Sequence, residues 1–212
     1  MYFLTKDLWF PPLSAASAEG IVALGGDLSP ERLLLAYQSG IFPWFESDDD
    51  IILWWSPDPR MVLFPEELKI SKSLRAELRK NRFQVTFDRA FDRVINACAS
   101  IRRSGQSGTW ITDDMKQAYA ELHRQGKARS VEVWENDELV GGLYGVDLGN
   151  VYCGESMFSK VSNASKVGFV HLVEHLRSLN YTLIDCQVYT DHLSRLGARE
   201  IRRKEFIEHL RD

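Results

Sequence analysis

The 212-residue chain is poor in cysteine and has no long hydrophobic run. Its three cysteines, Cys98, Cys153 and Cys186, are dispersed and form no C-x-x-C pair, which argues against a disulfide framework or a zinc site. No stretch approaches the roughly 18 apolar residues of a membrane-spanning helix, and residues 1–13 lack the pattern of a secretion signal. We therefore expect a cytoplasmic protein with no membrane partner and no bound metal.

An excess of positive charge is also absent. The chain has 26 Lys and Arg against 30 Asp and Glu, a net charge of -4, so the overall charge implies no general electrostatic attraction to nucleic acid. Any such contact must come from local basic segments, such as residues 69–82 and 199–204, and each of these is also typical of a solvated face. Aromatic side chains are plentiful, with six Trp and eleven Phe, and they either stack on bases or cover a small core.

The pattern of the first half predicts short strands and helices. Residues 1–28 indicate loops and short strands, and Ser29 followed by Pro30 is a typical helix start. We expect a basic helix over residues 71–82 and a strand over 83–87. Asp88 is expected to cap a helix that ends near Ser100, and a polar loop is expected over 102–108. Thr112 should cap a further helix closed by Gly126.

The second half predicts an α+β layer. Alternating residues indicate an antiparallel meander, followed by a long helix, a further strand and two short helices. The segments are residues 130–134, 138–146 and 151–158 for the meander, 164–179 for the helix, 181–187 for the strand, and 192–196 and 203–210 for the short helices. This order resembles the fold of the GCN5-related N-acetyltransferases (GNAT). We expect a small N-terminal α/β domain over residues 1–110 and a GNAT-like catalytic domain over 111–212, with the boundary between Gly108 and Ser130.

An acid and an amide occur together at the end of the last long strand. Alternate strand residues share a face, so Asp185 and Gln187 should point the same way and Cys186 the other way. Such a pair can orient a reacting amine or carbonyl, although a turn-capping Asp185 and a solvated Gln187 are the alternative. Glu155 ends or interrupts a neighbouring strand in a glycine-rich setting, and a carboxylate there can bind an ammonium group. Convergence of the three side chains in one cleft predicts a site.

Two other patterns favour ordinary structural roles, and the pattern that acetyl-CoA binding needs is absent. His171 to His175 matches an H-x-x-E-H zinc peptidase pattern, but Phe169, Leu172 and Leu176 form the apolar face and leave both histidines on the polar side. Cys186 beside Asp185 and His192 suggests a cysteine hydrolase, which the alternating strand geometry disfavours. Acetyl-CoA binding requires a glycine-rich loop before the long helix, and residues 159–166 contain no glycine.

Taken together, the motifs resemble the leucyl/phenylalanyl-tRNA–protein transferase family. The resemblance covers residues 24 to 200, and its matching segments are LGGDLSP (24–30), GIFPWF (40–45), ILWWSPDPR (52–60), TWIT (109–112), GGLYGV (141–146), GESMFS (154–159) with NASK (163–166), and DCQ (185–187). It implies transfer of Leu or Phe, and less well Met, from aminoacyl-tRNA to the N-terminal Lys or Arg of a protein, which marks that protein for N-degron degradation. It also implies no cofactor and a monomer.

The resemblance assigns roles to individual residues. Asp185 and Gln187 would be the catalytic pair, and Trp44 and Trp110 would hold the terminal adenosine of the tRNA. Glu155 would lie at an apolar pocket for the aminoacyl side chain, lined by Leu143, Tyr152, Phe169, Leu172, Leu176 and Ile184. Asp185 would orient Gln187 or accept a proton, unless the 2′-OH of the tRNA carries the proton. The competing hypotheses are a small-molecule N-acetyltransferase and an RNA-binding module without catalysis.

Overall fold

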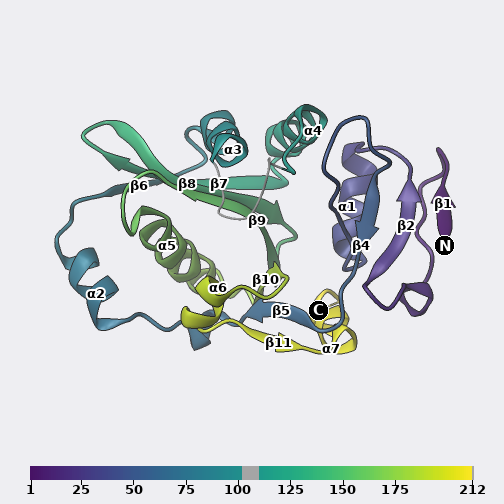
Figure 1. Cartoon of the computed structure of the whole chain (residues 1–212). Helices are drawn as coiled ribbons and strands as arrows, with labels where there is room; N and C mark the ends of the chain where they lie inside the picture. Colours follow the sequence, from purple (N-terminus) through teal and green to yellow (C-terminus); the bar gives the residue numbers. More distant parts are fainter. Residues whose placement is uncertain (102–109, 212) are drawn as a thin grey trace.

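Two β-sheets organise the chain in the computed structural model, which describes residues 1–101 and 110–211. The first sheet has the strand order β1-β2-β4-β3 and carries helix α1 (Pro30–Gln38) and the 3₁₀ turn Leu13–Ala15. Its strands are β1 (Tyr2–Leu4), β2 (Ile21–Gly25), β3 (Phe42–Pro43) and β4 (Leu53–Trp55). Trp54 is fully buried in it, and its indole Nε1 donates to the Gly25 carbonyl at 2.8 Å. This sheet lies at one end of the molecule (Figure 1).

The second sheet has the strand order β11-β5-β10-β9-β8-β7-β6. Strands β7, β8 and β9 form the predicted antiparallel meander, and β9 runs parallel to β10. The strands are β5 (Arg60–Leu63), β6 (Gln84–Phe87), β7 (Ala128–Glu135), β8 (Glu138–Asp147), β9 (Val151–Ser159), β10 (Leu183–Gln187) and β11 (Arg199–Ile201). The α+β class is therefore confirmed.

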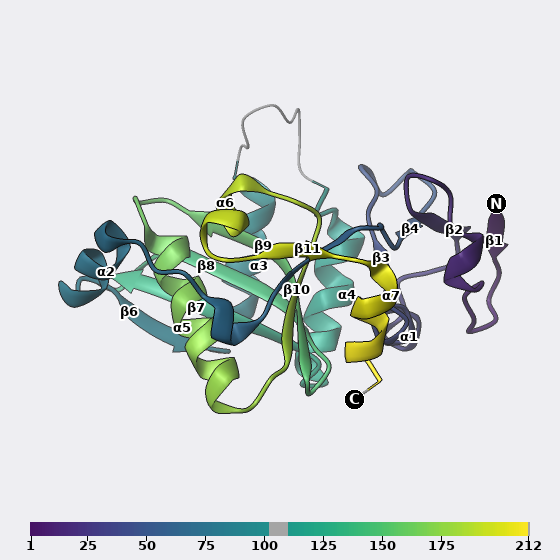
Figure 2. The ribbon, with the colours of Figure 1, turned by 90° about the horizontal axis from the view of Figure 1, so that it is seen from below.

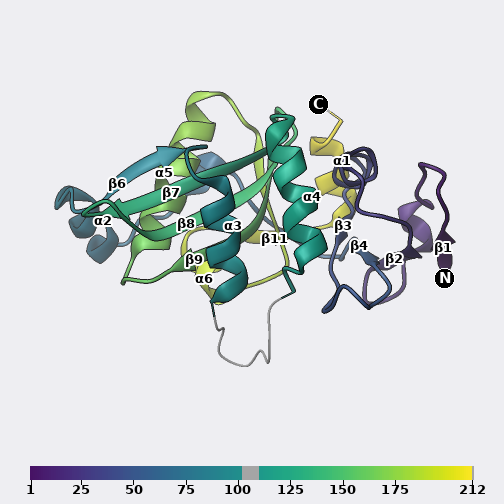
Figure 3. The same ribbon diagram turned by 90° about the horizontal axis from the view of Figure 1, so that it is seen from above.

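Helices cover both faces of the second sheet. Figures 1 and 3 show α3 (Phe91–Ser100) and α4 (Asp113–Arg124) on one face, with α5 (Ala164–Ser178) on the other. The view from below shows two of the shorter helices near α5 and the third toward α1 (Figure 2). They are α2 (Lys72–Arg79), α6 (Asp191–Arg195) and α7 (Arg203–His209), besides a 3₁₀ turn at Pro65–Glu67. On α5, Phe169, Leu172 and Leu176 are buried as predicted, whereas His175 is exposed.

The helix starts follow the predictions in part. Thr112 caps α4 by accepting a hydrogen bond from the Met115 N–H at 3.2 Å, and Gly126 ends that segment with φ of 71°. Ser29 occupies the cap position of α1, but its side chain makes no capping bond. The prediction for Asp88 is wrong, because α3 begins after Ala90 and Asp88 instead accepts from the Ser130 N–H at 2.9 Å. The polar loop predicted over 102–108 lies outside the described residues.

The sheets divide the chain at a different place from the predicted domain boundary. Strands β5 and β6 are hydrogen-bonded into the second sheet, through β10 and β7 respectively. Residues 60–101 therefore share a sheet and its helices with the second half, while β1 to β4 form the first sheet. A strand's partner depends on contacts distant in sequence, which a local pattern does not contain. We propose residues 56–59 as the junction between the two parts.

Candidate active site

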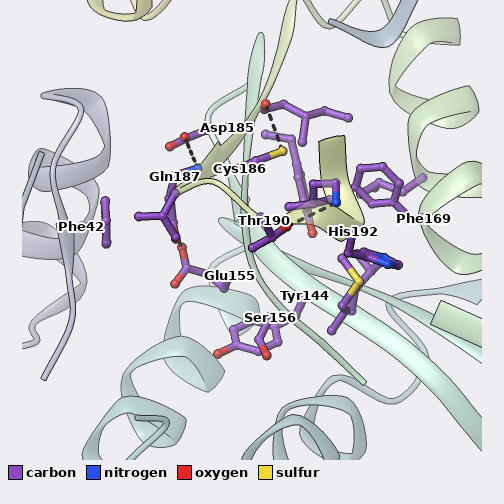
Figure 4. A pocket seen from close by; sticks show the side chains of 18 of the residues that line it. Phe42, Tyr144, Glu155, Ser156, Phe169, Asp185, Cys186, Gln187, Thr190 and His192 are labelled. Atoms are coloured by element: carbon purple, nitrogen blue, oxygen red, sulfur yellow. Dashed lines mark hydrogen bonds between the residues drawn. The ribbon is translucent and has the colours of Figure 1, made fainter. Parts of the chain in front are cut away.

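A cavity of about 430 Å³ opens beside the middle of β9 and the end of β10. Glu155 interrupts β9 and does not end it, because it lies within the strand where the pairing with β8 shifts register. The walls of the cavity come from both sheets: Phe42, Pro43 and Trp44 on one side and residues of β8, β9, β10, α5 and α6 on the other. Figure 4 shows Phe42 facing the cavity from the first sheet, with Phe169 and His192 on the far side. Except for Leu176, all the predicted site residues line it, namely Trp44, Trp110, Leu143, Tyr152, Glu155, Phe169, Leu172, Ile184, Asp185 and Gln187. Leu176 of α5 is buried in the core.

Asp185 is fully buried and bound to Arg60 of β5. The Arg60 guanidinium donates through Nε to Oδ1 at 2.8 Å and through Nη2 to Oδ2 at 2.6 Å. Arg60 also donates to the Gly40 carbonyl at 3.2 Å and lies over the rings of Phe42 and Phe206. Such a bidentate pair holds both carboxylate oxygens in a fixed orientation. The negative charge of Asp185 is thus compensated inside the protein.

Gln187 does not follow the strand alternation predicted for it. The pairing of β10 with β5 shifts register between Asp185 and Gln187, and Gln187 has a φ of 64°. Its N–H donates to Asp185 Oδ1 at 2.9 Å, while its side-chain Nε2 donates to Glu155 Oε1 at 2.7 Å. The regular alternation assumed in the sequence analysis is therefore broken at Gln187, although Asp185 and Gln187 both line the cavity and the Gln187 side chain reaches Glu155 (Figure 4). Asp185 orients Gln187 through its backbone.

Glu155 lies at the centre of a hydrogen-bonded chain. Tyr119 of α4 donates its hydroxyl to Glu155 Oε2 at 3.0 Å, and the Tyr119 hydroxyl is in turn hydrogen-bonded to that of Tyr37 in α1. Burial raises the pKa of Glu155 from 4.5 to about 7, although hydrogen bonds from Tyr37, Tyr119 and Gln187 favour the charged form. A carboxyl group with this pKa exchanges protons near neutral pH.

Aromatic side chains stand at the entrance to the cavity. Trp44 is 40% exposed, and its ring lies 5.7 Å from that of Trp55, centroid to centroid. Trp55 Nε1 donates to the Trp44 carbonyl at 2.9 Å, which holds this loop in place. Trp110 is half-buried in the same lining. Exposed indole faces beside a cavity can stack on a nucleotide base, whereas Trp54 serves the core.

The cysteine and histidine patterns do not combine into a nucleophilic site. Burial raises the pKa of the Cys186 thiol, which lines the cavity and lies 3.8 Å from the Ile184 carbonyl. Burial lowers the pKa of His192, which also lines the cavity. Asp185 is engaged by Arg60, so it is not placed as the acid of a Cys–His–Asp arrangement. Across residues 1–101 and 110–211, no group of His, Cys, Asp and Glu is placed to hold a metal ion.

Several residues of this site had no assigned role in the sequence prediction. Tyr37, Arg60 and Tyr119 bind the predicted acids, while Tyr144, Met157 and His192 are among the further lining residues. Arg60 stands 125 positions from its partner Asp185. The sequence feature that pointed to Arg60 was its place at the end of the family-matched segment 52–60. No such feature pointed to Tyr37 or Tyr119. Within the described ranges, no helix has the length and apolar character that crossing a membrane requires.

Similarity to known proteins covers almost the whole chain. The family profile described as leucyl/phenylalanyl-tRNA protein transferase matches residues 62–211, and the profile of its N-terminal domain matches residues 26–58. A leucyl/phenylalanyl-tRNA–protein transferase of Flavobacterium johnsoniae is 61% identical over 211 residues, covering 100% of this chain and 99% of the relative. One of Flavobacterium psychrophilum is 56% identical over 211 residues, covering 100% of both chains.

Among solved structures, a GCN5-related N-acetyltransferase from Kribbella flavida shows a partial likeness. Its TM-score is 0.39 at 8% identity, and the match covers 78% of this chain and 58% of that one. The sequence matches are far stronger, because both profiles and full-length relatives agree along the chain. The chain belongs to the leucyl/phenylalanyl-tRNA–protein transferase family of enzymes.

Proposed function

We propose that this enzyme transfers Leu or Phe, and less well Met, from the 3′ end of aminoacyl-tRNA to the N-terminal Lys or Arg of acceptor proteins. The new peptide bond would mark the acceptor for N-degron degradation. The acyl group is already activated as the tRNA ester, so the reaction needs no cofactor. We propose that the enzyme works as a cytoplasmic monomer.

The observation that carries this proposal is the make-up of one cavity. Leu143, Phe169, Leu172 and Ile184 provide an apolar wall, and Glu155 and Gln187 provide polar groups beside it. Trp44 and Trp110 lie in the same lining. One cavity therefore offers an apolar wall for the aminoacyl side chain, polar groups for the ester and the incoming amine, and indole rings for the terminal adenosine.

The proposed reaction is aminolysis of the ester. The α-amine of the acceptor must be neutral to attack, and with an unperturbed pKa of about 8 a modest fraction is neutral at neutral pH. The Asp185–Arg60 pair holds the backbone of Gln187, whose amide aligns the amine or polarises the ester carbonyl. In this role Asp185 positions Gln187 and does not itself take a proton, because Arg60 binds both of its oxygens. Positioning of this kind contributes strongly to the rate.

The first experiment follows labelled leucine from Leu-tRNA to two peptides that differ only at the N-terminal residue. We expect transfer to the peptide that begins with Arg and none to the one that begins with Asp. Equal transfer to both would contradict the proposed acceptor class. Transfer to neither would overturn the proposed activity, and acetyl-CoA binding would then test the competing acetyltransferase hypothesis.

A further inference from the structure

The acid predicted to be catalytic is not free to accept a proton. Asp185 is fully buried, and the Arg60 guanidinium binds both of its oxygens. Asp185 Oδ1 also accepts the N–H of Gln187 at 2.9 Å. Taking a proton would break this compensated pair and leave the charge of Arg60 uncompensated in the interior. The proton of the attacking amine therefore requires another acceptor.

Glu155 meets the geometric requirements for that acceptor. It lines the cavity, and its hydrogen bonds of known length are one to each oxygen, from Gln187 Nε2 at 2.7 Å and from Tyr119 at 3.0 Å. Tyr37 is a further donor to this carboxylate. A carboxylate offers about four acceptor positions, so these three bonds leave capacity for a fourth donor. Within the described residues, no salt bridge to Glu155 is present. Hydroxyl and amide donors stabilise its charged form.

We propose that Glu155 is the catalytic proton acceptor of this transferase, and that Tyr119, supported by Tyr37, is a positioning residue for its carboxylate. This inference rests on the proposed function. The nitrogen of the acceptor attacks the ester carbonyl carbon and forms the C–N bond. Its proton passes to Glu155 as the C–O bond to the ribose breaks. Glu155 then returns the proton to the departing ribose oxygen, so the carboxylate is restored and no further reactant is needed.

Groups on three neighbouring elements bear on the ionisation of Glu155. Tyr37 of α1, Tyr119 of α4 and Gln187 of β10 favour the charged carboxylate through hydrogen bonds, while burial and the charge of Asp185 favour the neutral acid. The balance raises the pKa of Glu155 to about 7. Tyr152 of β9 also faces this charge, and burial raises its pKa well above the ordinary range. Glu155 is therefore a carboxyl group of this cavity whose protonation changes near neutral pH.

The direct test compares wild type with Glu155→Gln under single-turnover conditions across the pH range. Both enzymes use the same acceptor peptide, so dividing the two rates at each pH removes the titration of the acceptor amine. We expect the ratio to rise with pH to a plateau of about 10²–10⁴, with a midpoint near the pKa of Glu155. The affinity for aminoacyl-tRNA should stay unchanged. A ratio near one at every pH, or a loss confined to substrate affinity, would overturn the inference.

A second variant tests the positioning role without removing the carboxylate. Tyr119→Phe deletes a hydrogen bond that favours the charged form of Glu155, so the midpoint of the pH profile should move to higher pH. The rate lost at neutral pH should return as the pH rises. A structural defect would lower the rate equally at every pH, and that result would overturn the role of Tyr119.

The two proposals fail in different ways. If wild type transfers no leucine to the Arg peptide, the proposed function fails. If wild type transfers leucine and Glu155→Gln does so equally well, only the role of Glu155 fails.

Discussion

Arg60 and Asp185 show how much one buried ion pair contributes at the scale of the residue. Arg60→Met would leave the carboxylate of Asp185 buried without its partner, and breaking such a pair costs about 3–5 kcal/mol. We expect a loss of this size in the free energy of unfolding measured with urea. The matched control is Arg199→Met, because Arg199 pairs with Glu67 at the surface, where a salt bridge contributes about 0–1 kcal/mol. Equal losses in the two variants would contradict the structural role assigned to Arg60.

Glu155 gives a pH-dependent prediction at the same scale. Its pKa in the folded state, about 7, lies above its ordinary value of 4.5, so the folded protein binds more protons between these pH values. This contribution to stability is complete below the unfolded pKa and is lost as pH rises through the folded pKa. Compared with wild type, Glu155→Gln should therefore gain stability as pH rises from about 4.5 to about 7, by up to about 3 kcal/mol. Thermal unfolding of both proteins at several pH values measures it, and a difference that does not change with pH would contradict it.

The residues of the cavity were predictable where the information was local or carried by the family motifs. Phe169 and Leu172 follow a helical period, and Glu155, Asp185 and Gln187 stand in short motifs. The ion pair between Arg60 and Asp185 was not predictable, because 125 positions separate the two residues. The backbone irregularity at Gln187 was also not predicted, since the alternation rule assumes a regular strand and β10 has a register shift there.

At the scale of the element, the close contact of β8 with β9 limits side-chain size. Gly145 pairs with Gly154, and a Cβ on Gly145 would overlap the Cys153 carbonyl oxygen and lie 2.8 Å from the Tyr152 ring. Gly145→Ala should therefore lower the unfolding temperature, with a cost of about 1–3 kcal/mol from overpacking. Gly154→Ala is the control, because its Cβ would lie 3.6 Å from the Asp185 carbonyl oxygen, an ordinary contact. Similar losses in both variants would show that strand entropy, and not the close contact, decides the effect.

The elements themselves were largely predictable from their patterns. The meander of β7, β8 and β9 follows from alternating residues and tight turns, and α5 follows from its apolar face. The placement of β5, β6 and β11 was not predictable, because their partners lie far away in sequence. This is why the predicted domain boundary differs from the division between the sheets.

At the scale of the whole molecule, the two sheets are tied together through the site. Tyr37 of the first part binds Tyr119 of the second, and Arg60 bonds to the Gly40 carbonyl. We therefore expect the protein to unfold in one transition. Tryptophan fluorescence, to which Trp54 in the first sheet contributes, should change at the same urea concentration as far-UV circular dichroism. Two separated transitions would show that the parts unfold independently.

The backbone of Gln187 has a consequence for sequence variation at this position. Its φ of 64° lies in the left-handed region, which costs most residues about 1–2 kcal/mol and which Gly and Asn tolerate best. Gly would relieve the strain but remove the amide that reaches Glu155, and Asn would keep an amide on a side chain one methylene shorter. A saturation library screened for stability alone should therefore favour Gly and Asn, whereas one screened for transfer should return Gln. At this one position, the residue that is best for folding would therefore differ from the residue that is best for the reaction.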